Sequence, residues 1–114
     1  MTQHDDKVRL RHMLDYSRKA IAMLEGRAQE DLKTDDMLSL ALTRAVEIIG
    51  EAAARVSPAI QQNHMSIPWP QIVGLRNRLV HGYDAVDLDI LWNIVQYDLP
   101  PLIEQLETAI ERMQ

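Results

Sequence analysis

The chain of 114 residues contains no cysteine and no phenylalanine, and it has only four glycines and five prolines. The absence of cysteine excludes a disulfide framework, a thiol nucleophile and a thiolate metal site. Four glycines and five prolines leave little room for the turns that sheets require. Apolar residues nevertheless make up 46% of the chain, although aromatic residues account for only 4%. This composition is typical of packed helices.

Long apolar runs are also missing, because none approaches the roughly 20 residues of a membrane-spanning helix. The first six residues, Met1 to Asp6, lack the apolar stretch of a signal peptide. We therefore expect a cytoplasmic protein that does not contact a membrane. The net charge of −5 argues against a broad basic surface for coating nucleic acid. Any contact with RNA should then be local.

The spacing of apolar residues predicts four amphipathic helical segments joined by short connections. They run from about Asp5 to Arg27, from Thr34 to Ser57, from Pro68 or Pro70 to His81-Gly82, and from Asp87 towards the C-terminus. The apolar residues of the last segment keep the same helical spacing on both sides of Pro100-Pro101. Because proline removes a backbone hydrogen bond, we expect one helix that is kinked there or two helices in line. The sequence thus predicts an all-α fold, a four- to five-helix up-and-down bundle, with residues 1–114 as one domain.

Gly50 lies inside the second predicted helix, where glycine costs about 1 kcal/mol relative to alanine. A glycine at such a position is typical of a close approach between helices. We therefore expect a packing role for Gly50.

Arg76 is unusual because a helical wheel of the third segment places it within an apolar arc. That arc contains Trp69, Ile72, Leu75, Leu79 and Val80. A guanidinium group keeps its charge and is costly to bury alone, so Arg76 should meet a carboxylate, reach a wet cleft or face an anionic ligand. Glu47 and Glu51 are the candidate carboxylate partners of Arg76. Arg78 is predicted on the opposite side, towards solvent.

Asn77 and His81 are four residues apart, which predicts that they share one face of the third helix. His81 falls in the predicted last turn, where the carbonyl ends of the helix favour an imidazolium. His81 could therefore act as an acid or a base, although a C-terminal cap or a surface residue is the simpler interpretation. Tyr83 follows the helix-ending Gly82 and is expected on a loop near the same cleft.

Taken together, Arg76, a polar Asn77, His81 five positions after the arginine, Gly82 and Tyr83 resemble the motif of the HEPN superfamily. The extension to His-x-Tyr is similar to its HepT-like toxin branch. The resemblance covers nearly the whole chain and includes Ile48 to Ala52, Trp69, Val86-Asp87 and Asp98 to Pro100. Asp84-Ala85 depart from the pattern, which carries an aromatic and a small residue there.

This resemblance implies a metal-independent endoribonuclease that needs no cofactor and is active as a homodimer, with the active cleft between two subunits. His81 would transfer protons and Arg76 would stabilise the phosphate oxygens during attack by the RNA 2′-hydroxyl. One histidine can hardly act both on the attacking 2′-hydroxyl and on the departing 5′-oxygen of an in-line displacement. Two subunits would supply two histidines. Asn77 and Arg78 would support the site or contact phosphate. The alternatives are that Asn77 is a polar residue at the rim of the cleft and that Arg78 is a solvated charge.

Tyr83 resembles the residue to which a nucleotidyltransferase antitoxin of the MNT type transfers AMP. The added charge and bulk would inhibit the nuclease of such a toxin–antitoxin pair. The implied partners are RNA, a second copy of the chain, and this antitoxin, with which the dimer could form a higher assembly. The competing hypotheses are a non-catalytic helical subunit that binds nucleotide or a nucleotidyltransferase partner, and a plain structural interaction domain.

Asp87 is expected to cap a helix, and no metal site is predicted.

Overall fold

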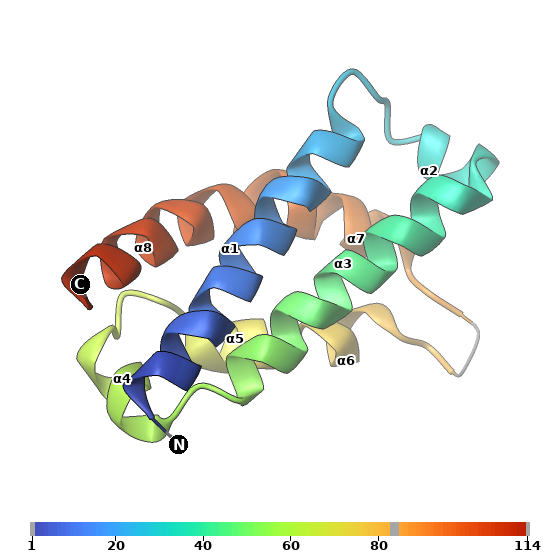
Figure 1. Ribbon diagram of the computed structural model, residues 1–114. Coiled ribbons are helices and arrows are strands. Elements are labelled where there is room, and N and C mark those ends of the chain that lie inside the picture. The colour runs from blue at the N-terminus through green and yellow to red at the C-terminus, as the bar shows by residue number, and fades with distance from the viewer. Residues whose placement is uncertain (1, 83–84, 114) are drawn as a thin grey trace.

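The computed structural model describes residues 2–82 and 85–113. Over these residues the fold is all-helical, as the composition predicts (Figure 1). The elements are α1 (Gln3–Leu24), α2 (Asp31–Thr34), α3 (Asp36–Ala54), α4 (Pro58–Asn63), α5 (Trp69–Val73), α6 (Leu75–Leu79), α7 (Leu88–Asn93), a π-helix (Ile94–Asp98) and α8 (Leu99–Arg112). The all-α class is confirmed, but a bundle of four or five helices is not, because the chain breaks into more and shorter elements. Within the described ranges, no helix is long and apolar enough to cross a membrane.

The core lies where α1 packs against both α3 and α8, and where α3 packs against α5 and α6. Most residues of the predicted apolar stripes are buried in the long helices, although Ala41 of the second stripe is exposed. Fully buried examples are Leu10, Met13, Leu42, Ile49, Leu75, Leu79, Leu91, Leu99 and Leu106. Figure 1 shows α1 and α3 side by side, with α8 extending from behind α1 towards the C-terminus. At about 25 cal/mol per Å² of apolar surface, burial of these side chains is the main stabilising contribution.

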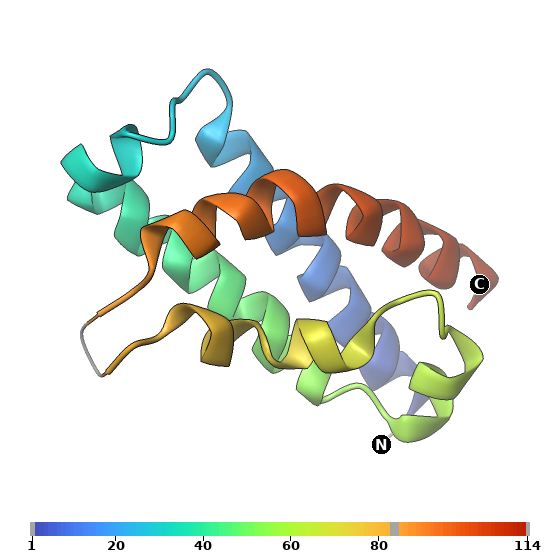
Figure 2. The ribbon, with the colours of Figure 1, turned by 180° about the vertical axis from the view of Figure 1, so that it is seen from behind.

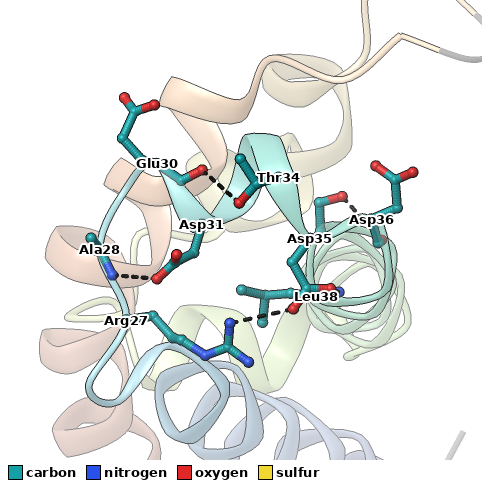
Figure 3. A network of polar contacts seen from close by, with 9 residues as sticks. Arg27, Ala28, Glu30, Asp31, Thr34, Asp35, Asp36 and Leu38 are labelled. Atoms are coloured by element: carbon teal, nitrogen blue, oxygen red, sulfur yellow. Dashed lines mark hydrogen bonds and ion pairs between the residues drawn. The ribbon is translucent and has the colours of Figure 1, made fainter.

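Capping side chains define the ends of α1 and α3. Thr2 forms a capping box at the start of α1, which therefore begins two residues before the predicted Asp5. Asp35 caps α3 by accepting the Leu38 N–H at 3.1 Å, and Arg27 contacts the same carboxylate at 3.3 Å (Figure 3). The Leu38 N–H is the main reason why the pKa of Asp35 lies below its ordinary value. The short α2 between these helices is an element that the sequence pattern did not predict.

The predicted third helix is wrong in its extent. It is two five-residue helices, α5 and α6, separated at Gly74, and it ends at Leu79 instead of His81-Gly82. Val80 is already extended and forms an isolated antiparallel bridge with Val86. A β-branched residue favours this conformation over helix. The connection between the second and third predicted helices contains α4, which also was not predicted.

The last segment continues from α7 through the π-helix into α8 (Figure 2). Pro100 and Pro101 lie in the first turn of α8, where a missing N–H is tolerated best. The structure thus places the irregularity in the π-helix at Ile94–Asp98, ahead of the predicted position, and α8 runs through Pro100 and Pro101 without a break. Val95, Leu99 and Leu102 are buried on either side of the change.

Gly50 has the packing role predicted for it. A Cβ atom at this position would lie 3.1 Å from the carbonyl oxygen of Ile72 and 3.9 Å from Cβ of Leu75. The backbone at the end of α5 therefore approaches α3 at the one place where α3 carries no side chain.

We predict that Gly50→Val lowers the free energy of unfolding by about 1–3 kcal/mol, because the added atoms overlap a backbone carbonyl that cannot rotate away. Ala41→Val, at an exposed position of the same helix, is the matched control and should cost about 0.5 kcal/mol. Urea unfolding measures both variants. Equal losses in the two variants would contradict the close approach.

The second prediction concerns Asp6, which is 2% exposed and joins α1 to the start of α4. Its carboxylate accepts the backbone N–H and the hydroxyl of Ser57, each at 2.8 Å. Asp6→Ala leaves both donors without this partner, so we expect a loss of about 2–3 kcal/mol in urea unfolding. Asp6→Asn should lose less, and the exposed Asp15→Ala almost nothing. An Asp6→Ala variant as stable as Asp15→Ala would rule out this anchor.

Candidate functional site

The short helix α6 carries three consecutive polar residues, Arg76, Asn77 and Arg78, all of them exposed. Leu75 and Leu79, four residues apart, are fully buried. They anchor the same side of the helix in the core. The burial of these two leucines therefore determines which way the three polar side chains face.

Arg76 forms an ion pair with Glu47 of α3, with 3.3 Å between Nε and Oε2. Arg76 thus meets a carboxylate, and Glu47 is one of the two carboxylates that the sequence suggested. The predicted place of Arg76 inside an apolar arc is wrong, because its side chain is 62% exposed. The break at Gly74 separates α6 from the α5 residues of that arc, and Val80 has left the helix.

Arg78 is not simply a solvated charge. Its Nη1 lies 2.7 Å from Oδ2 of Asp98, in the π-helix. Arg76 and Arg78 are about 200° apart around the axis of α6, so they reach opposite neighbours. Figure 2 shows the course of the chain, with α6 next to α3 and followed by the segment that leads into α7. Ion pairs therefore lie on two sides of α6.

His81 lies beyond the helix, next to the bridge between Val80 and Val86. Its backbone N–H donates to the Ala85 carbonyl at 2.8 Å, and the Asp87 N–H donates to the Leu79 carbonyl at 2.9 Å. Gly82 has φ +112°, a backbone conformation that favours glycine. The prediction that Asn77 and His81 share a helix face is wrong, since only Asn77 is helical. Tyr83 and Asp84 lie outside the described residues.

The imidazole of His81 faces the carboxylate of Asp87, with 3.5 Å between Nε2 and Oδ2. The other oxygen, Oδ1, accepts the Ile90 N–H at 3.0 Å and caps α7, as predicted. This bond is the main reason why the pKa of Asp87 is lowered; the Asp89 N–H and His81 add to the effect, and partial burial opposes it. An ionised Asp87 is thus fixed by the helix start, with its second oxygen beside the imidazole.

Sequence reasoning assigned Asp87 only its capping role and missed its contact with His81. A signal was available in the two valines, Val80 and Val86, which flank a glycine at a spacing suited to a short antiparallel turn. Pairing them brings the start of α7 back to the end of α6. The partner of Arg78, Asp98, was noticed only through the family resemblance.

The structure therefore gathers an exposed guanidinium and an exposed imidazole on one short stretch, each next to its own carboxylate. The side chains of Arg76 and His81 are both 62% exposed, and within the described ranges they contact Glu47 and Asp87 rather than each other. Such groups can bind an anion and transfer a proton. Among residues 2–82 and 85–113 there is no cluster of three or more side chains suited to hold a metal ion.

Comparison with known proteins gives one consistent result. The chain matches the family described as "Ribonuclease HepT-like" over residues 13–109. A protein of Methanocaldococcus jannaschii named as a candidate RNase is 32% identical over 107 residues, which are 94% of this chain and 98% of that protein. A candidate RNase of Caldanaerobacter subterraneus subsp. tengcongensis is 31% identical over 103 residues, 90% and 92% of the two chains. A probable ribonuclease HepT of Thermococcus cleftensis is 37% identical over 78 residues, 68% and 71% of the two. No solved structure gives a significant match.

The lowered pKa of Asp87 predicts a pH-dependent contribution to stability. A carboxylate with a depressed pKa in the folded state stabilises the protein above its unfolded pKa, and this contribution is lost as the pH falls through the folded pKa. Asp87→Asn keeps a capping oxygen that does not titrate. We expect the difference in Tm between the wild type and this variant to be largest above the ordinary aspartate pKa of about 3.9 and to shrink as the pH falls below it. A difference that stays constant as the pH falls would argue against the prediction.

Proposed function

The chain belongs to the HepT-like ribonuclease family, and on this basis we propose that it is an endoribonuclease in which Arg76 and His81 carry out the reaction. The names of its relatives, which describe them as ribonucleases, support the RNA-cleaving activity. The matched range of residues 13–109 supports treating residues 1–114 as one domain of this kind. The observation that carries the proposal is the exposed Arg76 of α6 and the exposed His81 two residues beyond its end, each next to a carboxylate.

In the proposed reaction, a base removes the proton of the RNA 2′-hydroxyl and O2′ attacks the neighbouring phosphorus. The bond from phosphorus to O5′ breaks, and an acid donates a proton to the departing O5′. His81 supplies the imidazole for a proton transfer, and Asp87 orients it. The products are a 2′,3′-cyclic phosphate and a 5′-hydroxyl, and these steps need no metal ion.

Arg76 stabilises the negative charge that develops on the phosphate oxygens. Glu47 contacts its Nε atom, so the two terminal amino groups of the guanidinium can form a bidentate contact with phosphate. Asn77, exposed on the same helix, supports the site as a hydrogen-bond donor to phosphate. Arg78 supports it through its ion pair with Asp98, which orients the arginine side chain.

The exposure of Arg76 and His81 favours a site that a second subunit completes. Electrostatic stabilisation of a transition state is weak in bulk water and strong in an enclosed site. A two-fold homodimer with this face at its interface would exclude water and bring a second His81 to the same phosphate. One imidazole would then act as the base and the other as the acid.

We further propose that a nucleotidyltransferase antitoxin of the MNT type controls this nuclease by transferring AMP to Tyr83. The position in the chain supports this, because Tyr83 follows His81 by two residues and comes directly after Gly82. An AMP group there would add negative charge next to the residues that must bind the RNA phosphate. The protein would then be the toxin of a toxin–antitoxin pair, in a dimer or in a higher assembly with the antitoxin.

Substitution of either proposed catalytic residue should abolish most of the RNA cleavage. We expect Arg76→Ala and His81→Ala each to lower the cleavage rate by about 100-fold or more, with Tm little changed. Arg18→Ala is the matched control, because Arg18 is also an exposed arginine in an ion pair. The assay uses purified protein and mixed RNA, with and without a chelator.

Two results would contradict the proposal. Cleavage that stops on addition of the chelator would exclude the metal-independent reaction. A folded dimer that never cleaves RNA would favour the alternative function, a non-catalytic helical subunit that binds nucleotide or a nucleotidyltransferase partner.

The proposed modification is tested by incubating the protein with ATP and a nucleotidyltransferase encoded next to it. We expect a mass increase of one or more AMP groups on the peptide that contains Tyr83, together with loss of cleavage. Tyr83→Phe should remain unmodified and active. AMP on Tyr97 or Tyr16 instead would show that Tyr83 is not the acceptor.

A further inference from the structure

A second site lies on the other side of α6 from Glu47. It is a cavity of about 230 Å³, and its lining includes Gln71, Arg78, Tyr97, Asp98, Pro101 and Gln105. These residues come from α5, α6, the π-helix and α8, which meet there. Of its lining residues, only the Arg78–Asp98 pair has a role in the site described above, which it supports.

The π-helix contributes an exposed aromatic ring to this cavity. Tyr97 is 70% exposed, which is unusual for a large side chain beside a well-packed core. π-Helical turns are uncommon and are frequent at functional sites, because the extra residue redirects side chains. Here the π-helix directs Tyr97 and Asp98 to the cavity while its neighbours Ile94 and Val95 stay buried.

The polar groups of the cavity favour a neutral ligand over a bare phosphate. Arg78 and Asp98 neutralise each other at 2.7 Å, so the pair offers hydrogen bonds without a net charge. Gln71 and Gln105 add two amides, which can both donate and accept. The Oε1 atom of Gln105 is buried and has no hydrogen-bond partner among the described residues. A rotation of this amide towards the cavity would allow a ligand N–H to satisfy it.

We propose that this cavity binds one unpaired nucleobase of the RNA substrate, an inference that rests on the proposed nuclease function. The base stacks on the ring of Tyr97, and its edge forms hydrogen bonds with Gln105 and Gln71. Stacking on an aromatic ring combined with hydrogen bonds to amides is how proteins commonly recognise single-stranded RNA. Since α6 carries Arg78 two residues after Arg76, the same helix contacts a base and the phosphate to be cleaved. The cavity would thus determine which base lies near the cleavage position.

Binding is measured by fluorescence anisotropy with labelled oligonucleotides of A, C, G or U, using His81→Ala protein so that the RNA stays intact. We expect one base to be preferred. Tyr97→Ala should weaken binding of the preferred oligonucleotide by about 5- to 150-fold, the range for loss of one stacked base. Tyr97→Phe should retain the affinity, and Gln105→Ala should reduce the preference among the bases. Met65→Ala, at another exposed apolar position outside this cavity, is the control and should bind as the parent protein does.

Each outcome separates this proposal from the nuclease itself. If Tyr97→Ala binds all four oligonucleotides as tightly as Met65→Ala, the base site is wrong, whether or not Arg76 and His81 are needed for cleavage. If binding depends on Tyr97 but the wild type never cleaves RNA, the base site is supported and the nuclease proposal fails. A free mononucleotide that binds as tightly as the oligonucleotide would overturn the assignment to RNA.

Discussion

The approach of α3 to the end of α5 at Gly50 is the constraint on which the rest of this structure depends. A hydrogen atom in place of a side chain lets the Ile72 carbonyl and Leu75 come against α3. Leu75 begins α6, and Glu47 precedes Gly50 by about one helical turn, so this contact also sets Arg76 beside Glu47. A larger residue at position 50 would displace the helix that carries the candidate site, although it touches none of the site's side chains.

The five residues of α6 are far too few to form a stable helix alone, so its position is a product of tertiary packing. The two buried leucines supply the free energy, because exposed ion pairs contribute only about 0–1 kcal/mol each. The ion pairs of Arg76 and Arg78 instead orient their side chains in opposite directions. One arginine is thus directed to the proposed phosphate site and the other to the proposed base site. The chain then turns at Gly82 and returns through Asp87, which combines a helix cap with the contact to His81.

The sequence was sufficient for the all-α class, for the apolar stripes of the long helices and for the role of Gly50, because these depend on local periodicity and on the cost of glycine in a helix. It was also sufficient to suggest Glu47 as a partner of Arg76. It failed at the end of the third segment, where a wheel drawn through Gly74 placed Arg76 in an apolar arc and His81 on a helix. The break at Gly74 and the bridge from Val80 to Val86 depend on packing against distant segments, which periodicity cannot reveal. The contact of Arg78 with Asp98 was missed for the same reason, because it depends on the π-helix before Pro100.

Identification of the new ends of the cleaved RNA tests most directly whether Arg76 and His81 act through the RNA's own 2′-hydroxyl. A defined RNA is cut by the purified protein in the presence of a chelator, and the fragments are analysed by mass spectrometry. The proposed reaction predicts a 2′,3′-cyclic phosphate, or the 2′- or 3′-phosphate that forms from it, on one fragment and a 5′-hydroxyl on the other. Fragments that end in a 3′-hydroxyl and a 5′-phosphate would show that water attacked the phosphorus, and would contradict the roles proposed for both residues.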